Sequence, residues 1–250
     1  MFKIFAVFCF LFSAFFLTSC GIEDVPFIPP VPNGNITQEF NNRATIPLPN
    51  IFYGTPFTHF AIYYRIYVSD AVFSSTDRGV LTAINPQLAT NFTFFDRYVD
   101  SEDHVNPQMH TTFEQRGYFP LQLAEDHISR VLSASALGSS IVIEFPSGRN
   151  PFMRIGTEEF TLLRNNGAGI FHPEPSDRLF FVNFDELWRP SNLVSGINRD
   201  VANLSGIADG TRRYTYVSMY IVAVGVNVAT WTNIFSTPSF VHVFLLPDPR

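Results

Sequence analysis

The sequence predicts a mainly β protein, folded as an antiparallel β-sandwich that carries a partly helical insertion. Seven runs rich in β-branched and aromatic residues are separated by turn residues, a pattern typical of sandwiches. One of them, residues 60–68, alternates with the period of two that a half-buried strand has. Another, residues 214–226, is apolar on both faces, as expected for a central strand of a sheet.

The N-terminus has the features of an export signal. Lys3 gives the short N-terminal region a positive charge, and the fourteen residues that follow it, 4–17, are uncharged and almost wholly apolar. This length is typical of a signal-peptide core and is shorter than the roughly 20 residues that cross a bilayer. We therefore expect residues 1–19 to be a signal peptide.

A lipobox follows the apolar core. An aliphatic residue, two small residues and a cysteine stand in the order of bacterial lipoprotein signals: Leu17, Thr18, Ser19 and Cys20. The first three residues are the expected signal-peptidase recognition site, and the thiol of Cys20 is the expected acceptor of the lipid. Two or three acyl chains such as palmitate anchor a protein stably, so attachment to the membrane needs no transmembrane helix.

The residues after the lipobox predict a tether and a location. Residues 20–39 form the expected tether, because four prolines within residues 22–32 favour a stiff, extended chain. Gly21 and Ile22 follow the cysteine, where an aspartate would signal retention in the inner membrane. The sequence thus predicts an exported, lipid-anchored protein of the cell envelope, in the outer membrane rather than the inner one if the cell has both.

Residues 40–250 are predicted to form a single β-rich domain. Shorter strands are expected over four further runs: residues 141–145, 152–155, 160–164 and 179–184. After residues 214–226, a connection of about thirteen residues leads to the last strand, residues 240–246. We expect these two final runs to pair as antiparallel neighbours, with the first of them central in its sheet.

The insertion is expected over residues 74–137 and holds the predicted helices. One short helix is expected over residues 76–84, and a second begins at Asn85 and Pro86 as cap and first turn. Residues 124–137 carry apolar side chains on one side, as an amphipathic helix does.

Three strands resemble those of a known sandwich. Residues 60–67 (FAIYYRIY) are similar to the C strand of fibronectin type III domains, and residues 214–225 and 236–247 are similar to their F and G strands. About 145 residues separate the first match from the second, far more than one such module contains. The resemblance implies an immunoglobulin/fibronectin III-like antiparallel β-sandwich with a large, partly helical insertion.

Six segments beyond the lipobox carry a second resemblance, which covers most of the mature chain. They are FTHFAIYYRIY, RGYFPLQL, EFTLLRNN, DRLFFVNFDEL, YVSMYIVAVG and STPSFVHVFLLP. Together they resemble a family of spirochaete (treponemal-type) envelope lipoproteins. The resemblance implies an envelope lipoprotein and carries over no catalytic residue.

Composition excludes several classes of chemistry. The net charge of −6 is scattered without a basic stripe, so no nucleic-acid partner is expected. Lys3 is the only lysine, which leaves the mature chain without a Schiff-base lysine or a Walker A phosphate loop. Cys9 lies in the signal and Cys20 is acylated, so the mature domain has no disulfide, thiolate metal site or cysteine nucleophile.

One polar cluster is a candidate metal site. Residues 100–106 (DSEDHVN) bring carboxylates and an amide together, and Ca²⁺ takes about six to eight oxygens. The spacing and the glycine of a calcium loop are missing, which favours a solvated acidic loop, with calcium as the alternative. His104 and His110 lie six residues apart, wider than zinc ligands usually lie. We predict no metal and no cofactor.

No catalytic motif stands out. The Gly-x-Ser-x-Gly signature of serine hydrolases is absent from the sequence. The carboxylate pairs Glu158-Glu159 and Asp185-Glu186 are adjacent in sequence, and neighbours on a strand point to opposite faces, so neither pair predicts the two converging acids of a glycosidase.

Aromatic side chains give the candidate binding surface. Tyr63, Arg65 and Tyr67 share one face of the strand predicted over residues 60–68, and such side chains are enriched in interaction hot spots. The alternative is plain sheet structure, with this face covered by the helical insertion. Trp188 and Trp231 are expected to pack in the core or at its rim.

The expected function is that of a non-enzymatic binding or interaction module, displayed on a membrane and directed to a protein or carbohydrate ligand of the envelope. The alternative is an envelope hydrolase or carbohydrate-processing enzyme with an untypical site. A solute-binding lipoprotein is a third class, but its two lobes need more helices than this sequence supplies.

Overall fold

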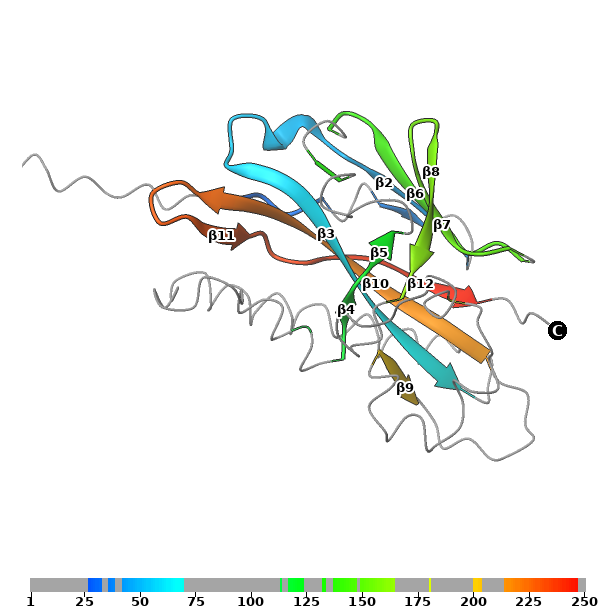
Figure 1. The fold of residues 1–250 in the computed structure, drawn as a ribbon. Helices are drawn as coiled ribbons and strands as arrows, with labels where there is room; N and C mark the ends of the chain where they lie inside the picture. Colours follow the sequence, from blue (N-terminus) through cyan, green and yellow to red (C-terminus); the bar gives the residue numbers. More distant parts are fainter. Residues whose placement is uncertain are drawn as a thin grey trace, which may run out of the picture.

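The computed structural model describes residues 27–32, 36–38, 42–69, 113, 117–123, 132–133, 137–147, 149–164, 180, 200–203 and 214–246. These residues form two β-sheets that pack face to face (Figure 1). The helix predicted over residues 76–84 and the one predicted to begin at Asn85 lie outside the described residues, as does nearly all of the strand predicted over 179–184.

The first sheet has six strands whose neighbours all pair antiparallel. Across the sheet they lie in the order β1 (Thr37–Gln38), β2 (Arg43–Pro47), β6 (Ser140–Glu144), β7 (Phe152–Ile155), β8 (Glu158–Leu163) and β5 (Gln122–Leu123). In β2 and β6, alternate residues are buried, which is the pattern of strands with one face on a core.

The second sheet is built on two long strands, β3 (Phe57–Ser69) and β10 (Tyr214–Asn227), which pair antiparallel along almost their whole length. The other edge of β10 pairs with β12 (Ser239–Leu246) and β11 (Thr232–Phe235), so β10 is central, as predicted. The other edge of β3 pairs antiparallel with β4 (Phe119–Pro120) and parallel with β9 (Val201–Asn203).

The main core lies between the two sheets and is built by strand alternation. The strand β3 contributes Phe60, Ile62, Tyr64, Ile66 and Val68 to it, and β10 contributes Val217, Met219, Ile221 and Ala223. The first sheet supplies the opposite layer through residues of β2, β6, β7 and β8: Ala44, Ile46, Ile141, Ile143, Met153 and Leu162. The architecture is therefore mainly β and sandwich-like.

Six of the seven predicted strands lie where the sequence placed them, within two or three residues at each end. The prediction that β10 pairs with β12 is confirmed, with Thr215 opposite Leu246 and a bulge between Met219 and Tyr220. Short strands such as β1, β2 and β9 were not predicted, because runs of two to five residues carry too little alternation to be recognised.

Two predictions about the connections need correction. The end of the helix predicted over residues 124–137 is not helical: Ser133 bridges to His59, and the carbonyl of Leu132 accepts the backbone N–H of Phe60 at 3.0 Å. The tether predicted over residues 20–39 packs on the domain within its described part, since Ile28 and Val31 are buried in the main core. The proline-rich composition indicated extended chain but not what that chain contacts.

Candidate functional site

Several sequence predictions lie outside the described residues. These are the lipobox (Leu17, Thr18, Ser19 and Cys20), the acidic cluster at 100–106, His104, His110, the pair Asp185-Glu186, and Trp188. The described residues contain no group of three or more His, Cys, Asp or Glu side chains placed to hold a metal ion. Within the same residues, no helix is long and apolar enough to cross a membrane.

The predicted surface of Tyr63, Arg65 and Tyr67 forms on one face of β3 but is not an exposed ladder. Tyr63 is fully buried and Tyr67 is 4% exposed, while Arg65 is half-buried. The ring of Phe113 stacks on Tyr63 with centroids 4.0 Å apart. The two tyrosine rings are therefore not open to a ligand, which corrects the prediction of a binding surface there.

The covering side chains come from the predicted insertion, which is the alternative that the sequence left open. Phe113 and Tyr118 lie over the outer face of the second sheet and pack with Tyr63, Tyr220 and Val222. The ring of Tyr118 meets that of Tyr220 edge to face, with centroids 5.2 Å apart. We call Tyr63, Phe113, Tyr118, Tyr220 and Val222 the outer-face cluster.

Tyrosine hydroxyls connect the outer-face cluster to its neighbours. The hydroxyls of Tyr67 and Tyr118 lie 3.2 Å apart, and that of Tyr118 donates to Oγ of Ser218 at 3.3 Å. Burial raises the pKa of Tyr67 and raises the pKa of Tyr118 well above its ordinary value, with the neighbouring Tyr67 and Tyr220 adding to the latter. These hydroxyls therefore stay protonated at neutral pH.

Arg65 lies at the rim of this face and depends on a glycine. Its guanidinium carbon lies 5.3 Å from the ring centroid of Tyr67. Gly117 has a φ of +73°, and a methyl group on it would lie only 2.8 Å from the same guanidinium carbon. Glycine is the residue that permits both the left-handed backbone and the close approach of Arg65.

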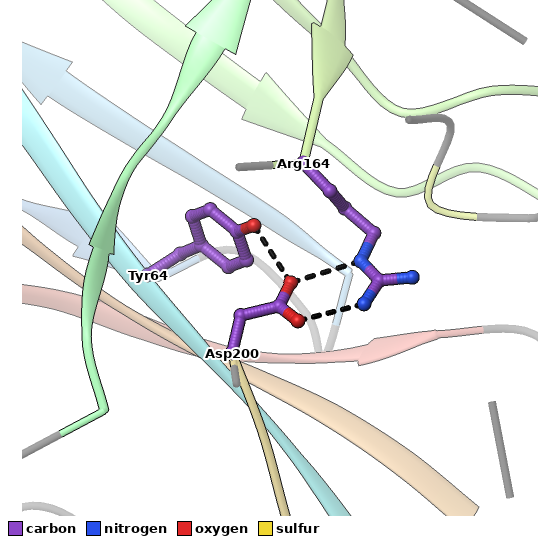
Figure 2. A network of polar contacts seen from close by, with 3 residues as sticks. All are labelled: Tyr64, Arg164 and Asp200. Atoms are coloured by element: carbon purple, nitrogen blue, oxygen red, sulfur yellow. Dashed lines mark hydrogen bonds and ion pairs between the residues drawn. The ribbon is translucent and has the colours of Figure 1, made fainter. Parts of the chain in front are cut away.

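A buried polar network joins the two sheets inside the core (Figure 2). Arg164, directly after β8, donates from Nε and Nη2 to the two carboxylate oxygens of Asp200 at 2.9 and 2.7 Å. Tyr64 of β3 donates its hydroxyl to Oδ2 of the same carboxylate at 2.7 Å. The backbone carbonyl of Asp200 accepts the N–H of Ile66 at 2.8 Å, at the start of β9.

The chemistry of this group is that of a closed ion pair. Asp200 is fully buried and the side chain of Arg164 is 5% exposed. Burial by itself lowers the pKa of the Arg164 guanidinium, but the charge and hydrogen bonds of Asp200, with a contribution from Tyr64, raise it above its ordinary value. Both carboxylate oxygens are engaged, so the arrangement is suited to holding the sheets in register and not to binding a substrate.

The surface pair Glu158-Glu159 behaves differently. Both residues lie on β8 and are exposed, and Glu159 accepts a hydrogen bond at 3.0 Å from Arg149, which precedes β7. The Arg149–Glu159 ion pair is thus a solvent-exposed counterpart of the buried Arg164–Asp200 pair.

Sequence reasoning missed two features. Arg164 and Asp200 are 36 residues apart in sequence and belong to no motif, so no local pattern could have paired them. Trp231 was expected to pack, whereas the structure leaves it 81% exposed. The uncharged stretch around it, residues 225–239, was the signal that could have identified an unusual turn.

Searches of protein-family models, curated proteins and solved structures found no match to this chain.

Proposed function

We propose that this chain is a membrane-anchored bacterial lipoprotein whose mature domain is a non-enzymatic binding or interaction module of the cell envelope. The observation that carries the proposal is the lipobox, Leu17, Thr18, Ser19 and Cys20, directly after an apolar core of fourteen residues. The anchor consists of acyl chains on Cys20, in the outer membrane if the cell has two membranes. The expected ligand is a protein or carbohydrate of the envelope.

The use of polar groups in the domain supports an interaction module. Both carboxylate oxygens of Asp200 accept hydrogen bonds from Arg164 and Tyr64, and the ion pair links the two sheets. A rigid sandwich presents its connecting loops at its two ends, and binding residues are found disproportionately on loops held by such scaffolds.

We also propose that the domain is a distant variant of the immunoglobulin/fibronectin III fold. The neighbours β3, β10 and β12 correspond in order and direction to strands C, F and G of that fold, which share one sheet. The first sheet differs from it, because β6, β7 and β8 follow one another as a meander. An experimental structure of the whole chain would test this proposal, which fails if β3, β10 and β12 do not lie side by side in that order.

The lipid anchor is tested by growing cells with a radioactive fatty acid. The unaltered chain should carry the label and sediment with membranes, while Cys20→Ala should lose the label and accumulate as a larger precursor. Cys9→Ala is the matched control, because Cys9 lies in the apolar core of the signal and should not be acylated. Label on the Cys20→Ala protein would show that Cys20 is not the lipidation site.

A further inference from the structure

Large apolar side chains that are exposed gather at one end of the sandwich. Among the described residues there are five of them: Phe27, Ile51, Tyr53, Val228 and Trp231. They come from three segments that are far apart in sequence: the N-terminal segment, the connection between β2 and β3, and the turn between β10 and β11. Figure 1 shows that connection and that turn at the same end of the molecule.

Backbone contacts bring the three segments together. The N–H of Val226, just before the turn, donates to the carbonyl of Pro56 in the β2–β3 connection at 3.1 Å. Gly225 is packed so closely that a methyl group on it would overlap both that carbonyl and Cδ1 of Ile28. We call residues 27–28, 50–56 and 227–232 the apolar end.

The apolar end carries no charge. Residues 27–32, 48–58 and 225–239 contain no aspartate, glutamate, lysine or arginine, although the whole chain is 15% charged. Scattered apolar residues are ordinary on a protein surface, but a group of them without any charge marks an interaction site.

The turn itself holds its tryptophan at a conformational cost. Trp231 has a φ of +56°, in the left-handed region that favours glycine, and its N–H donates to the carbonyl of Asn227 at 2.7 Å. Because Trp231 is 81% exposed, it contributes little to the core of the domain. Contact with something outside the domain therefore accounts for its strained backbone better than packing within the domain does.

The N-terminal segment of the apolar end is close to Cys20 in sequence. Ile28 lies against Gly225, while the carbonyl of Val31 accepts a hydrogen bond from Ser239, which is paired with Ile221. From Ile28 to Val31 the N-terminal segment thus runs away from the apolar end and into the domain, and Phe27 precedes it at the apolar end. Cys20 is only seven residues before Phe27, so the two are at most about 25 Å apart.

We propose that the apolar end inserts into the membrane interface beside the lipid anchor and so fixes the orientation of the domain on the bilayer. This inference rests on the proposed function, because the anchor at Cys20 is what holds this end near the membrane. Tryptophan and tyrosine favour the interface between head groups and acyl chains, where their polar atoms stay hydrated. Because the apolar end is uncharged, insertion should need no anionic lipid and should not weaken with salt.

The test uses the full-length lipidated protein, reconstituted into phosphatidylcholine vesicles that contain a nitroxide-labelled lipid. Val228→Cys places one thiol at the apolar end for an environment-sensitive fluorophore. Ser147→Cys is the control, at an exposed turn that follows Phe145 by two residues. The ring centroids of Phe145 and Phe244 lie 4.8 Å apart, and Phe244 is paired with Val217 of β10. Val217 precedes Asn227 by ten residues, so the turn at Ser147 lies about 33 Å from the apolar end, measured along β10.

The expected result is that the nitroxide lipid quenches about half of the fluorescence at position 228 and almost none at position 147, since interfacial segments reach about 5–10 Å into the boundary. Trp231→Ser should reduce the quenching at position 228, and 1 M salt should leave it unchanged. Equal quenching at both positions, or none at either in protein that floats with the vesicles, would overturn the proposed insertion. A label at position 228 that is shielded from water but not quenched would indicate contact with a second copy of the chain and would also overturn it.

The two proposals fail in different ways. The chain without an added cysteine should not react with the fluorophore, because Cys20 is acylated. If that chain takes up the label and does not float with vesicles, the lipoprotein proposal itself is wrong. If it floats unlabelled while position 228 stays unquenched, only the membrane contact is wrong.

Discussion

The substitution Asp200→Asn tests how much it costs to leave one charge of the buried ion pair without its partner. It keeps the size of the side chain but removes the charge that faces Arg164. Asp200 is fully buried and accepts three hydrogen bonds, two from Arg164 and one from Tyr64. After the substitution, the Arg164 guanidinium, 5% exposed, keeps its charge without a counter-ion.

The magnitude follows from burial. Removing one partner of a buried pair costs about 3–5 kcal/mol, because the other charge stays in the interior uncompensated. This is a large share of the roughly 5–15 kcal/mol that stabilises a domain. The matched control is Glu159→Gln, which makes the same chemical change in the Arg149–Glu159 pair. Those side chains are 52% and 43% exposed, and an exposed pair contributes about 0–1 kcal/mol.

The assay is urea unfolding of both variants and the unaltered chain, followed by circular dichroism and extrapolated to water. A double variant, Asp200→Asn with Arg164→Met, should recover part of the loss, because no buried charge remains without a partner. The reasoning would be refuted if Asp200→Asn cost no more than Glu159→Gln. It would be refuted equally if the double variant were less stable than the single variant by the full cost of a second independent substitution.

Three further predictions concern the second sheet and the turn. Val222→Asp buries a carboxylate in the outer-face cluster and should prevent folding, whereas Val228→Asp, at a position 74% exposed, should fold normally; circular dichroism distinguishes them. Burial raises the pKa of Tyr67 and Tyr118 above the 10.0 of an unfolded tyrosine. The contribution of their neutral hydroxyls to the unfolding free energy is therefore complete below pH 10.0 and is lost as the pH rises toward the pKa values of the folded state. Replacing both by phenylalanine should therefore flatten the decline of the unfolding free energy above about pH 10, and an unchanged slope in alkaline urea titrations would contradict this. Trp231→Gly removes about 1–2 kcal/mol of left-handed backbone strain and adds about 0.5–1 kcal/mol of unfolded-state entropy, so we expect the unfolding free energy to stay the same or to rise slightly. A loss of stability in urea would show that the tryptophan packs on the domain.

The sequence by itself predicted the elements whose pattern is local and long. The alternation in residues 60–68 predicted both β3 and its two faces, because a strand turns successive side chains to opposite sides. The run at 214–226 predicted a central strand, since only a strand covered on both faces and paired on both edges is apolar throughout. The lipobox prediction also rests on the sequence alone, because it depends only on the order of four neighbouring residues, and it stays a prediction.

The tertiary structure decided what covers each face and which distant residues meet. The sequence showed that Tyr63, Arg65 and Tyr67 share a face of β3, but only packing placed Phe113 over that face and buried the tyrosines. Burial is a property of the whole chain, because the covering side chain comes from a segment about fifty residues away.

Ion pairing and exposure depend on the fold in the same way. Arg164 and Asp200 meet because the end of β8 and the start of β9 approach each other across the core, which no spacing in the sequence encodes. The exposed aromatic residues at one end of the sandwich gather because Pro56, Gly225 and Ile28 pack together there. A local sequence pattern shows which residues of a strand share a face. The neighbours of each side chain, in contrast, depend on segments that are distant in sequence and come together only when the chain folds.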